Sequence, residues 1–118
     1  MREERGQLQG NQTFAEPIDF FGSVSGDVKV VDGGKVYVRG AIYGDLTVEH
    51  GGRVHIYGNV SGKLTVLQGA KVIVSGIIGA DAINDGGRLY IDGSAKVLGK
   101  VRQYAGETKI DKFAQVRE

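Results

Sequence analysis

The chain repeats one 18-residue unit three times in succession, as GSVSGDVKVVDGGKVYVR (residues 22–39), GAIYGDLTVEHGGRVHIY (40–57) and GNVSGKLTVLQGAKVIVS (58–75). Each unit opens with a glycine and carries aliphatic residues at alternate positions. A fixed period of this length, with glycine at the corners, is typical of a β-solenoid, in which one unit forms one rung. The repeat therefore predicts an all-β, single-stranded β-solenoid.

Five positions of each unit are aliphatic, and they fall mostly in pairs two residues apart. In the second unit they are Ile42, Leu46, Val48, Val54 and Ile56. Pairs with this spacing predict short strands that turn one face inward. Gly-Asp and Gly-Gly steps separate the pairs and favour turns. We expect about three short strands per rung and rungs stacked at the ~4.8 Å spacing of a parallel sheet.

The repeat weakens toward both ends of the chain. Residues 76–92 keep the Gly-Gly-Arg turn but are one residue short, and only a rough alternation continues through residues 93–111. Upstream, residues 6–21 keep a Gly-x-Leu-x-Gly opening. We expect about six rungs in a solenoid domain over residues 6–111, with regular repeats at 22–92 and atypical end rungs at 6–21 and 93–111. Residues 1–5 are expected to form a short polar tail, and residues 112–118 a C-terminal tail or cap.

Aromatic residues occur near both ends of the predicted solenoid. Terminal rungs commonly differ from the consensus because an open end is an unpaired sheet edge. Phe20 and Phe21 at one end and Phe113 at the other are candidates to cover the core or to join copies of the chain. The simpler interpretation is that each is an ordinary core residue.

Composition excludes several functional classes. The 118 residues include 15 Lys or Arg and 14 Asp or Glu, so the formal net charge is +1, and there is no Cys. Disulfides, thiolate metal sites and thiol catalysis are therefore excluded, and the small net charge argues against a dedicated, specific nucleic-acid binder. No apolar run approaches the ~20 residues of a membrane span. We expect no transmembrane segment, no signal peptide and a cytoplasmic location.

Catalytic residues are not evident in the sequence. His50 and His55 are its two histidines, and their nearest acidic residues, Asp45 and Glu49, are sequence neighbours with no nucleophile beside them. We interpret both histidines as surface residues. The sequence thus predicts a protein that is not an enzyme and that has no cofactor and no metal site.

An aspartate recurs at the sixth position of the unit, as Asp27, Asp45 and Asp81. Stacked carboxylates could bind a cation, but Lys63 interrupts the series. We therefore favour aspartates that accept hydrogen bonds from backbone N–H groups at the turns.

The predicted outer surface carries a basic and aromatic pattern. Position 14 of four successive units is basic, and positions 16 and 18 are largely aromatic or basic. These residues are Lys35, Arg53, Lys71 and Arg88, with Tyr37, His55, Tyr90, Arg39 and Tyr57 beside them. Aromatic and arginine side chains are enriched at interface centres, so this face is a hypothetical binding surface for an acidic protein surface or a polyanion. The alternative is that Lys and Arg solubilise the sheet while Tyr packs across rungs.

The openings of the three units resemble the repeats of the bactofilin family. They read G22-x-V24-x-G26-D27-V28, G40-x-I42-x-G44-D45-L46 and G58-x-V60-x-G62-K63-L64. The resemblance covers roughly residues 22–92. It implies a triangular, right-handed β-helix that assembles end to end without a nucleotide and scaffolds partners at the membrane or cell envelope. The chain departs from the family in having no evident long disordered tail and in its Pro and aromatic insertions near the ends.

A second architecture is compatible with the period, because 18 residues are also three hexapeptides. Val24, Val30 and Val36 are six apart, which is the spacing of a left-handed hexapeptide helix. Acyltransferases of that fold need a loop His, and its carbonic anhydrases need three His around zinc. Two His cannot complete that zinc site, and bound zinc in the purified protein would be the sign of this alternative.

Three functions remain open from the sequence. The first is a structural, bactofilin-like scaffold that self-associates into oligomers or filaments through its solenoid ends, at Phe20, Phe21 and Phe113. The second is a capped monomeric or dimeric binding module, of the inhibitor or immunity type, that uses the basic and aromatic face. The third is the hexapeptide-type enzyme.

Overall fold

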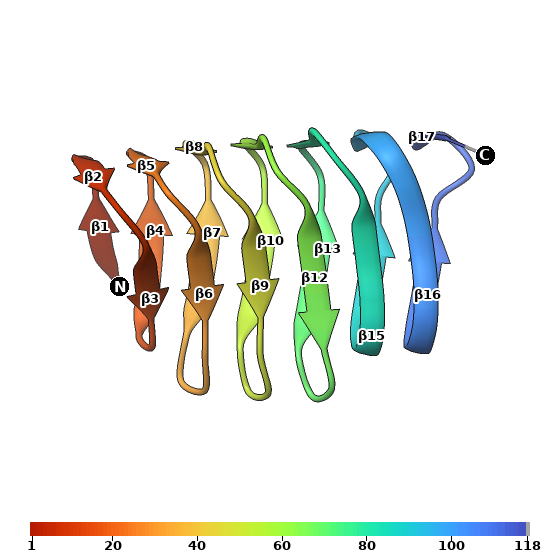
Figure 1. Cartoon of the computed structure of the whole chain (residues 1–118), viewed down its shortest axis with the longest axis horizontal. Helices are drawn as coiled ribbons and strands as arrows, with labels where there is room; N and C mark the ends of the chain where they lie inside the picture. The colour runs from red at the N-terminus through yellow and green to blue at the C-terminus, as the bar shows by residue number, and fades with distance from the viewer. Residues whose placement is uncertain (118) are drawn as a thin grey trace.

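The computed structural model describes residues 1–117, which form 17 β-strands and no helix. In chain order the strands are β1 (Arg2–Glu4), β2 (Gln7–Gln9), β3 (Gln12–Phe14), β4 (Pro17–Phe20), β5 (Ser23–Ser25), β6 (Val28–Val30), β7 (Lys35–Val38), β8 (Ala41–Ile42), β9 (Leu46–Val48), β10 (Arg53–Ile56), β11 (Asn59–Val60), β12 (Leu64–Leu67), β13 (Lys71–Val74), β14 (Ile77–Ile78), β15 (Ala82–Ile91), β16 (Lys96–Ile110) and β17 (Gln115–Arg117). Their stacking gives about six turns of a β-solenoid, as the repeat predicted (Figure 1).

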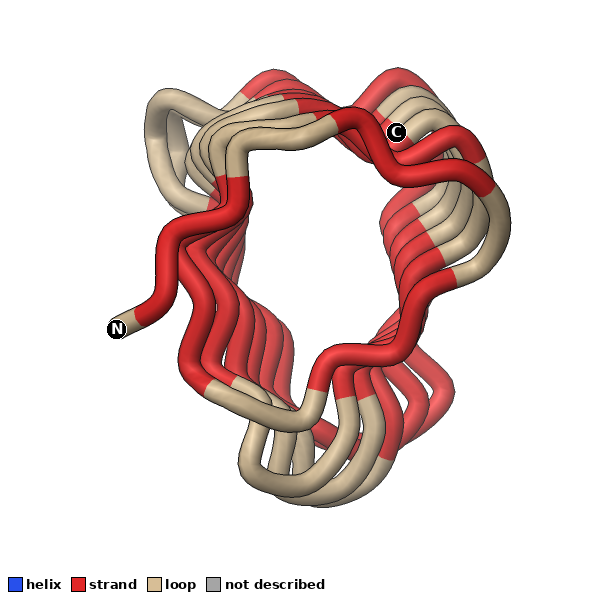
Figure 2. Tube along the Cα trace, turned by 90° about the vertical axis from the view of Figure 1, so that its left-hand side faces the viewer, coloured by secondary structure: helices blue, strands red, loops and turns tan. Residues whose placement is uncertain are grey.

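The solenoid has three sides, each a column of parallel strands. The β3 side contains β3, β6, β9 and β12, followed by the first parts of β15 and β16. The β4 side contains β1, β4, β7, β10 and β13, followed by the second parts of β15 and β16. The β2 side contains β2, β5, β8, β11, β14, the start of β16, and β17. Viewed from the N-terminal end, the chain runs clockwise as it recedes, so the solenoid is right-handed (Figure 2). This hand disagrees with the left-handed hexapeptide architecture.

In the regular repeats, parallel strands pair so that each residue lies beside the residue 18 positions away, which is the period of the sequence. Val54 of β10 pairs with Val36 of β7 and with Val72 of β13. Each inward residue therefore stacks on its counterpart one rung away, and the five aliphatic positions of the unit form continuous buried columns. Where the repeat loses one residue, the register shortens with it, since Lys71 pairs with Arg88, and a bulge at Leu67 absorbs the difference.

Glycine opens each unit because the backbone of the neighbouring rung leaves no room for a side chain. A Cβ at Gly40 would overlap the carbonyl oxygen of Gly22, and a Cβ at Gly58 would overlap that of Gly40. Close backbone approach at a corner is therefore what fixes glycine at this position.

Both ends of the solenoid extend beyond the expected boundaries. Residues 2–4, expected in a polar tail, form β1 and pair with β4, and residues 115–117 form β17 and pair with β16. Strand pairing uses backbone groups, so a polar sequence joins the sheet when the chain returns to the same side.

The recurrent aspartates accept hydrogen bonds from backbone N–H groups, and each N–H belongs to the next rung. Oδ1 of Asn11 accepts from the N–H of Asp27 (2.9 Å), Asp27 from that of Asp45 (2.8 Å), and Asp45 from that of Lys63 (2.9 Å). The series resumes at Asp81, whose carboxylate accepts from the N–H of Lys100 (2.8 Å). That hydrogen bond and a second one from Arg102 lower the pKa of the Asp81 carboxyl group.

Lys63 is the one position where this ladder is interrupted, so Lys63→Asn should restore it. The amide oxygen of Asn can accept the N–H of Asp81 without adding a charge between Asp45 and Asp81. We expect Lys63→Asn to raise the thermal midpoint, and Asp45→Ala, which removes an existing acceptor, to lower the free energy of unfolding by about 1 kcal/mol. Thermal and urea unfolding followed by circular dichroism measure both. An Asn variant no more stable than Lys63→Gln, whose longer side chain is the matched control, would contradict the ladder interpretation.

Candidate functional site

The β4 side carries seven of the nine residues of the predicted binding face, and Arg39 and Tyr57 lie at its edge, directly after β7 and β10. In one outward row, Lys35, Arg53, Lys71 and Arg88 pair in direct register across β7, β10, β13 and β15. We call these four residues the basic row. In the next outward row, the register aligns Tyr37, His55, Ile73 and Tyr90. The sequence period therefore predicted the arrangement of this face.

Arg39 is the centre of a compact cluster at the edge of this face. Its guanidinium carbon lies 4.7 Å from the ring centroid of Tyr57, 5.6 Å from that of Tyr37 and 5.8 Å from that of Phe21. Its Nε donates a hydrogen bond of 2.7 Å to Asp19 Oδ1. This hydrogen bond is the main reason that the pKa of Arg39 is raised. Arg39 is thus held by several interactions within the protein, whereas in the basic row Lys35 has only a cation–π contact of 5.8 Å with Tyr37 and Arg88 only a long contact of 3.9 Å with Glu107.

His55 belongs to a hydrogen-bonded chain that crosses three rungs. Its ring stacks on Tyr57 with centroids 3.9 Å apart, and its Nε2 lies 2.8 Å from Ser75 Oγ. Ser75 Oγ in turn donates to Asp92 Oδ2 at 2.5 Å. A hydroxyl has one proton to donate, so when Ser75 donates to Asp92 it accepts from the Nε2–H of His55.

This order differs from that of a nucleophilic triad. In a Ser-His-Asp triad the histidine lies between the acid and the serine and accepts the serine proton. Here Ser75 lies in the middle and its proton is directed to Asp92. The arrangement does not activate Ser75 as a nucleophile, and it instead links the side chains of neighbouring rungs.

The pKa values of the two ends of this chain are both lowered, for different reasons. Burial is the main cause for His55, and the positive charge of Arg39 adds to it, while the charge of Asp92 opposes both. For Asp92 the main causes are the hydrogen bonds from Ser75 and Ser94. The folded protein therefore favours a neutral His55 beside an ionised Asp92.

The titration of His55 tests this description. Because its pKa is lower in the folded than in the unfolded protein, the unfolded state binds more protons between those two values, and stability falls as the pH drops from ~6.5 through the folded pKa. We expect Asp92→Asn to lower the pKa of His55 further and Arg39→Gln to raise it. NMR titration of the His Cε1–H resonances, assigned with a His50→Gln variant, measures these shifts. A wild-type midpoint at or above 6.5 would contradict the burial of His55.

The two ends of the solenoid differ in chemistry. At the N-terminal end, Arg2 and Glu4 of β1 lie in register with the buried Ile18 and Phe20, so charged side chains cover this part of the core. Arg2 also forms an ion pair of 2.7 Å with Glu16. Charged side chains on a terminal strand discourage pairing with another chain. This end therefore resembles a cap.

At the C-terminal end, apolar side chains of the last rung are left uncovered. Val101 and Ile110 of β16 lie in register with the buried Ala82 and Ile91, yet Val101 is half-buried and Ile110 is 44% exposed. Leu98, Tyr104 and Phe113, from the same segment, are also exposed. The alternation of Val97, Val101 and Ile110 in the sequence was the signal for inward positions here, but exposure depends on the absence of a further rung.

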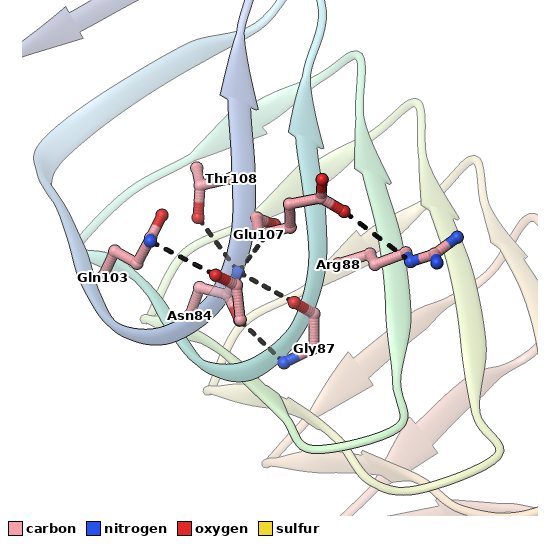
Figure 3. Close-up of polar contacts among 7 residues, drawn as sticks. Asn84, Gly87, Arg88, Gln103, Glu107 and Thr108 are labelled. Carbon is pink, nitrogen blue, oxygen red and sulfur yellow. Dashed lines mark hydrogen bonds and ion pairs between the residues drawn. The ribbon is translucent and has the colours of Figure 1, made fainter.

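A buried polar residue stabilises the last turn. Asn84 lies in register with Val66, so its amide occupies one position in a buried column of aliphatic side chains. Its Nδ2 donates to the carbonyl oxygen of Glu107 (2.9 Å) and to Thr108 Oγ1 (2.9 Å), and its Oδ1 accepts the N–H of Gly87 (2.9 Å), as Figure 3 shows. Asn84 thereby links β16 to β15 at the corner of the uncovered rung.

The three predicted end residues lie in three different environments. Phe20 is completely buried under Glu4 and packs against Phe14, with ring centroids 5.9 Å apart. Phe21 lies under the guanidinium of Arg5, 4.2 Å from its ring centroid. Phe113 is 72% exposed. Of the three, Phe113 is the one at an uncovered end, and Phe14 was the core-covering residue that sequence reasoning missed.

Within residues 1–117 no group of three or more His, Cys, Asp or Glu side chains is placed to hold a metal ion. The same part of the chain contains no helix long and apolar enough to cross a membrane. No protein-family model matches the chain, and neither a curated protein nor a solved structure matches it.

Proposed function

We propose that this chain is a non-catalytic structural protein that associates with itself through its C-terminal rung. The observation that carries the proposal is the difference between the ends, with Arg2 and Glu4 over the core at one end and Val101, Ile110 and Phe113 uncovered at the other. An exposed strand edge with apolar neighbours is a template for pairing with another chain. The resemblance of the repeats to bactofilins supports a scaffold role, and the expected cytoplasmic location belongs to the same proposal.

The geometry favours pairing of two C-terminal ends. Such a contact uses the same surface on both copies and closes as a twofold dimer. A contact between unlike ends would bury Arg2 and Glu4 of the next copy against apolar side chains, and burying an unpaired charge is costly. Bactofilin-like filaments would require contacts at the N-terminal end as well, so we expect dimers to form before longer assemblies.

The charged N-terminal end also supports a second candidate function. If the C-terminal rung does not associate, the chain is a monomeric binding module of the inhibitor or immunity type, and the β4 side is its binding surface. The in-register basic row supports this alternative.

The size of the assembly and its dependence on Ile110 test the proposal. We expect Ile110→Lys and Phe113→Lys to shift the wild-type protein from dimer to monomer, because each adds a charge where two rungs would meet. Sedimentation velocity over a concentration series, with negative-stain microscopy for filaments, measures the assembly. Circular dichroism checks that the variants are folded.

Ile77→Lys is the matched control, since Ile77 is 41% exposed but lies on the β2 side, away from the end. Wild-type protein that is monomeric at all concentrations would overturn self-association and favour the binding module. Assemblies that persist in both end variants, or that are lost equally in Ile77→Lys, would show that the C-terminal rung is not the contact.

A further inference from the structure

The basic row is an uncompensated line of positive charge on a rigid surface. Its four side chains project from adjacent strands of one parallel sheet at ~4.8 Å intervals, so the line spans roughly 14 Å. Like charges placed directly opposite on neighbouring strands repel each other. The solenoid backbone fixes this spacing, because each residue is hydrogen-bonded in register to the rungs on either side.

Carboxylates elsewhere on the same solenoid neutralise single cations. Arg2 pairs with Glu16, Arg39 with Asp19 and Arg102 with Asp81. By contrast, within residues 1–117 no ion pair is formed by Lys35, Arg53 or Lys71. Arg88 reaches Glu107 at 3.9 Å, with both side chains about three-quarters exposed, a contact of little energetic value.

A shallow groove of ≈ 670 Å³ runs beside the basic row. Arg53, Lys71 and Arg88 line it together with glycines of the successive turns, among them Gly51 and Gly69. Glycine has no side chain, so an elongated molecule can lie against the backbone there while the cations reach it from one side. The groove ends in acidic residues, with Asp32 in its first rung and Glu107 in its last.

The spacing of the row restricts the ligand. In an extended peptide the side chains that share one face are ~6.8 Å apart, so acidic side chains would lose register with the rungs after one or two contacts. In an extended acidic polysaccharide each sugar ring advances by roughly 5 Å, a length close to the ~4.8 Å between rungs. Acidic groups that share one face of such a chain, on every second sugar, therefore stay in register with every second rung over several sugars. Single-stranded nucleic acid binds largely by stacking on a series of free aromatic rings. On this face His55, Tyr57 and Tyr37 are packed against one another and against Arg39, so that exposed Tyr90 is a single ring and not a series.

We propose that the basic row is a binding site for an acidic polysaccharide that runs along the solenoid axis, with its carboxylates or sulfates in register with Arg53, Lys71 and Arg88 in the groove and with Lys35 in the rung before them. Pro17 precedes Lys35 in this register and Glu107 follows Arg88, so the site is limited to four rungs. The four cations belong to β7, β10, β13 and β15, whereas the proposed self-association uses β16, whose Glu107 lies at the end of the groove. Binding and self-association are therefore tested with separate substitutions.

Titration calorimetry with oligogalacturonates and heparin-derived oligosaccharides of two, four, six and eight sugars tests the site. We expect affinity to increase up to four sugars and then to level off. Arg53→Gln with Lys71→Gln should weaken binding at least tenfold and reduce the salt dependence by about one unit of slope per cation removed. Glu107→Gln should strengthen binding, because it removes the carboxylate at the end of the row.

Lys63→Gln with Lys96→Gln is the matched control, because it removes the same charge from two exposed positions outside the β4 side, directly before β12 and at the start of β16. We expect its affinity to stay within about twofold of wild type. An equal loss in this control, or no binding of any oligosaccharide, would overturn the proposal. So would binding of single-stranded oligothymidylate of equal charge, or of phosphatidylserine vesicles, with the same affinity and the same dependence on Arg53 and Lys71.

Discussion

Parallel pairing in an 18-residue register is the constraint on which the rest of this structure depends. It places each residue beside its counterpart one rung away, as Val36, Val54 and Val72 show. Favourable contacts therefore recur from rung to rung. They are the packing of the aliphatic core columns and the hydrogen bonds that aspartates accept from N–H groups of the next rung. The same constraint forces glycine onto glycine at the corners and aligns like charges along the surface. The core stabilises the fold against this repulsion, since it buries 25 apolar side chains in one continuous cluster.

The same regularity separates the sides of the molecule from its ends. On the sides, backbone N–H and C=O groups are hydrogen-bonded to the neighbouring rungs, and the same type of side chain recurs along each row. A side can therefore recognise a ligand that has a regular repeat of its own. At the ends of the described part, residues 1–117, the repeat stops, and the outermost strand of each side has a neighbouring strand on one edge only. There the local sequence decides whether the edge is protected, as with Arg2 and Glu4, or left apolar, as with Ile110.

Polar side chains in this solenoid act mainly by linking rungs. Asn84 holds the last turn, Asp45 holds the next rung, and Ser75 connects His55 to Asp92. None of these groups has the order or the partners of a catalytic set. The proposed self-association uses β16, and the proposed polysaccharide site uses cations of the four preceding rungs, in a groove that ends at Glu107 of β16. In a dimer joined at its C-terminal rungs, the two basic rows would therefore lie on either side of the contact.

The sequence by itself determined a β-solenoid with 18-residue rungs, its inward positions in the regular repeats and the row Lys35, Arg53, Lys71 and Arg88, because a strict period maps directly onto parallel register. The hand of the solenoid came only from the structure, since a period of 18 fits either hand. The sequence could not determine what lies over each end. Phe20 is near the start of the chain yet buried, because β1 pairs with β4 over it. Ile110 has an inward pattern yet is exposed, because residues 111–117 place no further strand on the β4 side. Contacts such as Ser75 with Asp92 also required the tertiary structure. Ser75 and Asp92 lie on different rungs, and the unit that ends at Asp92 is one residue shorter than the others. That shorter unit changes which side chains meet between the two rungs.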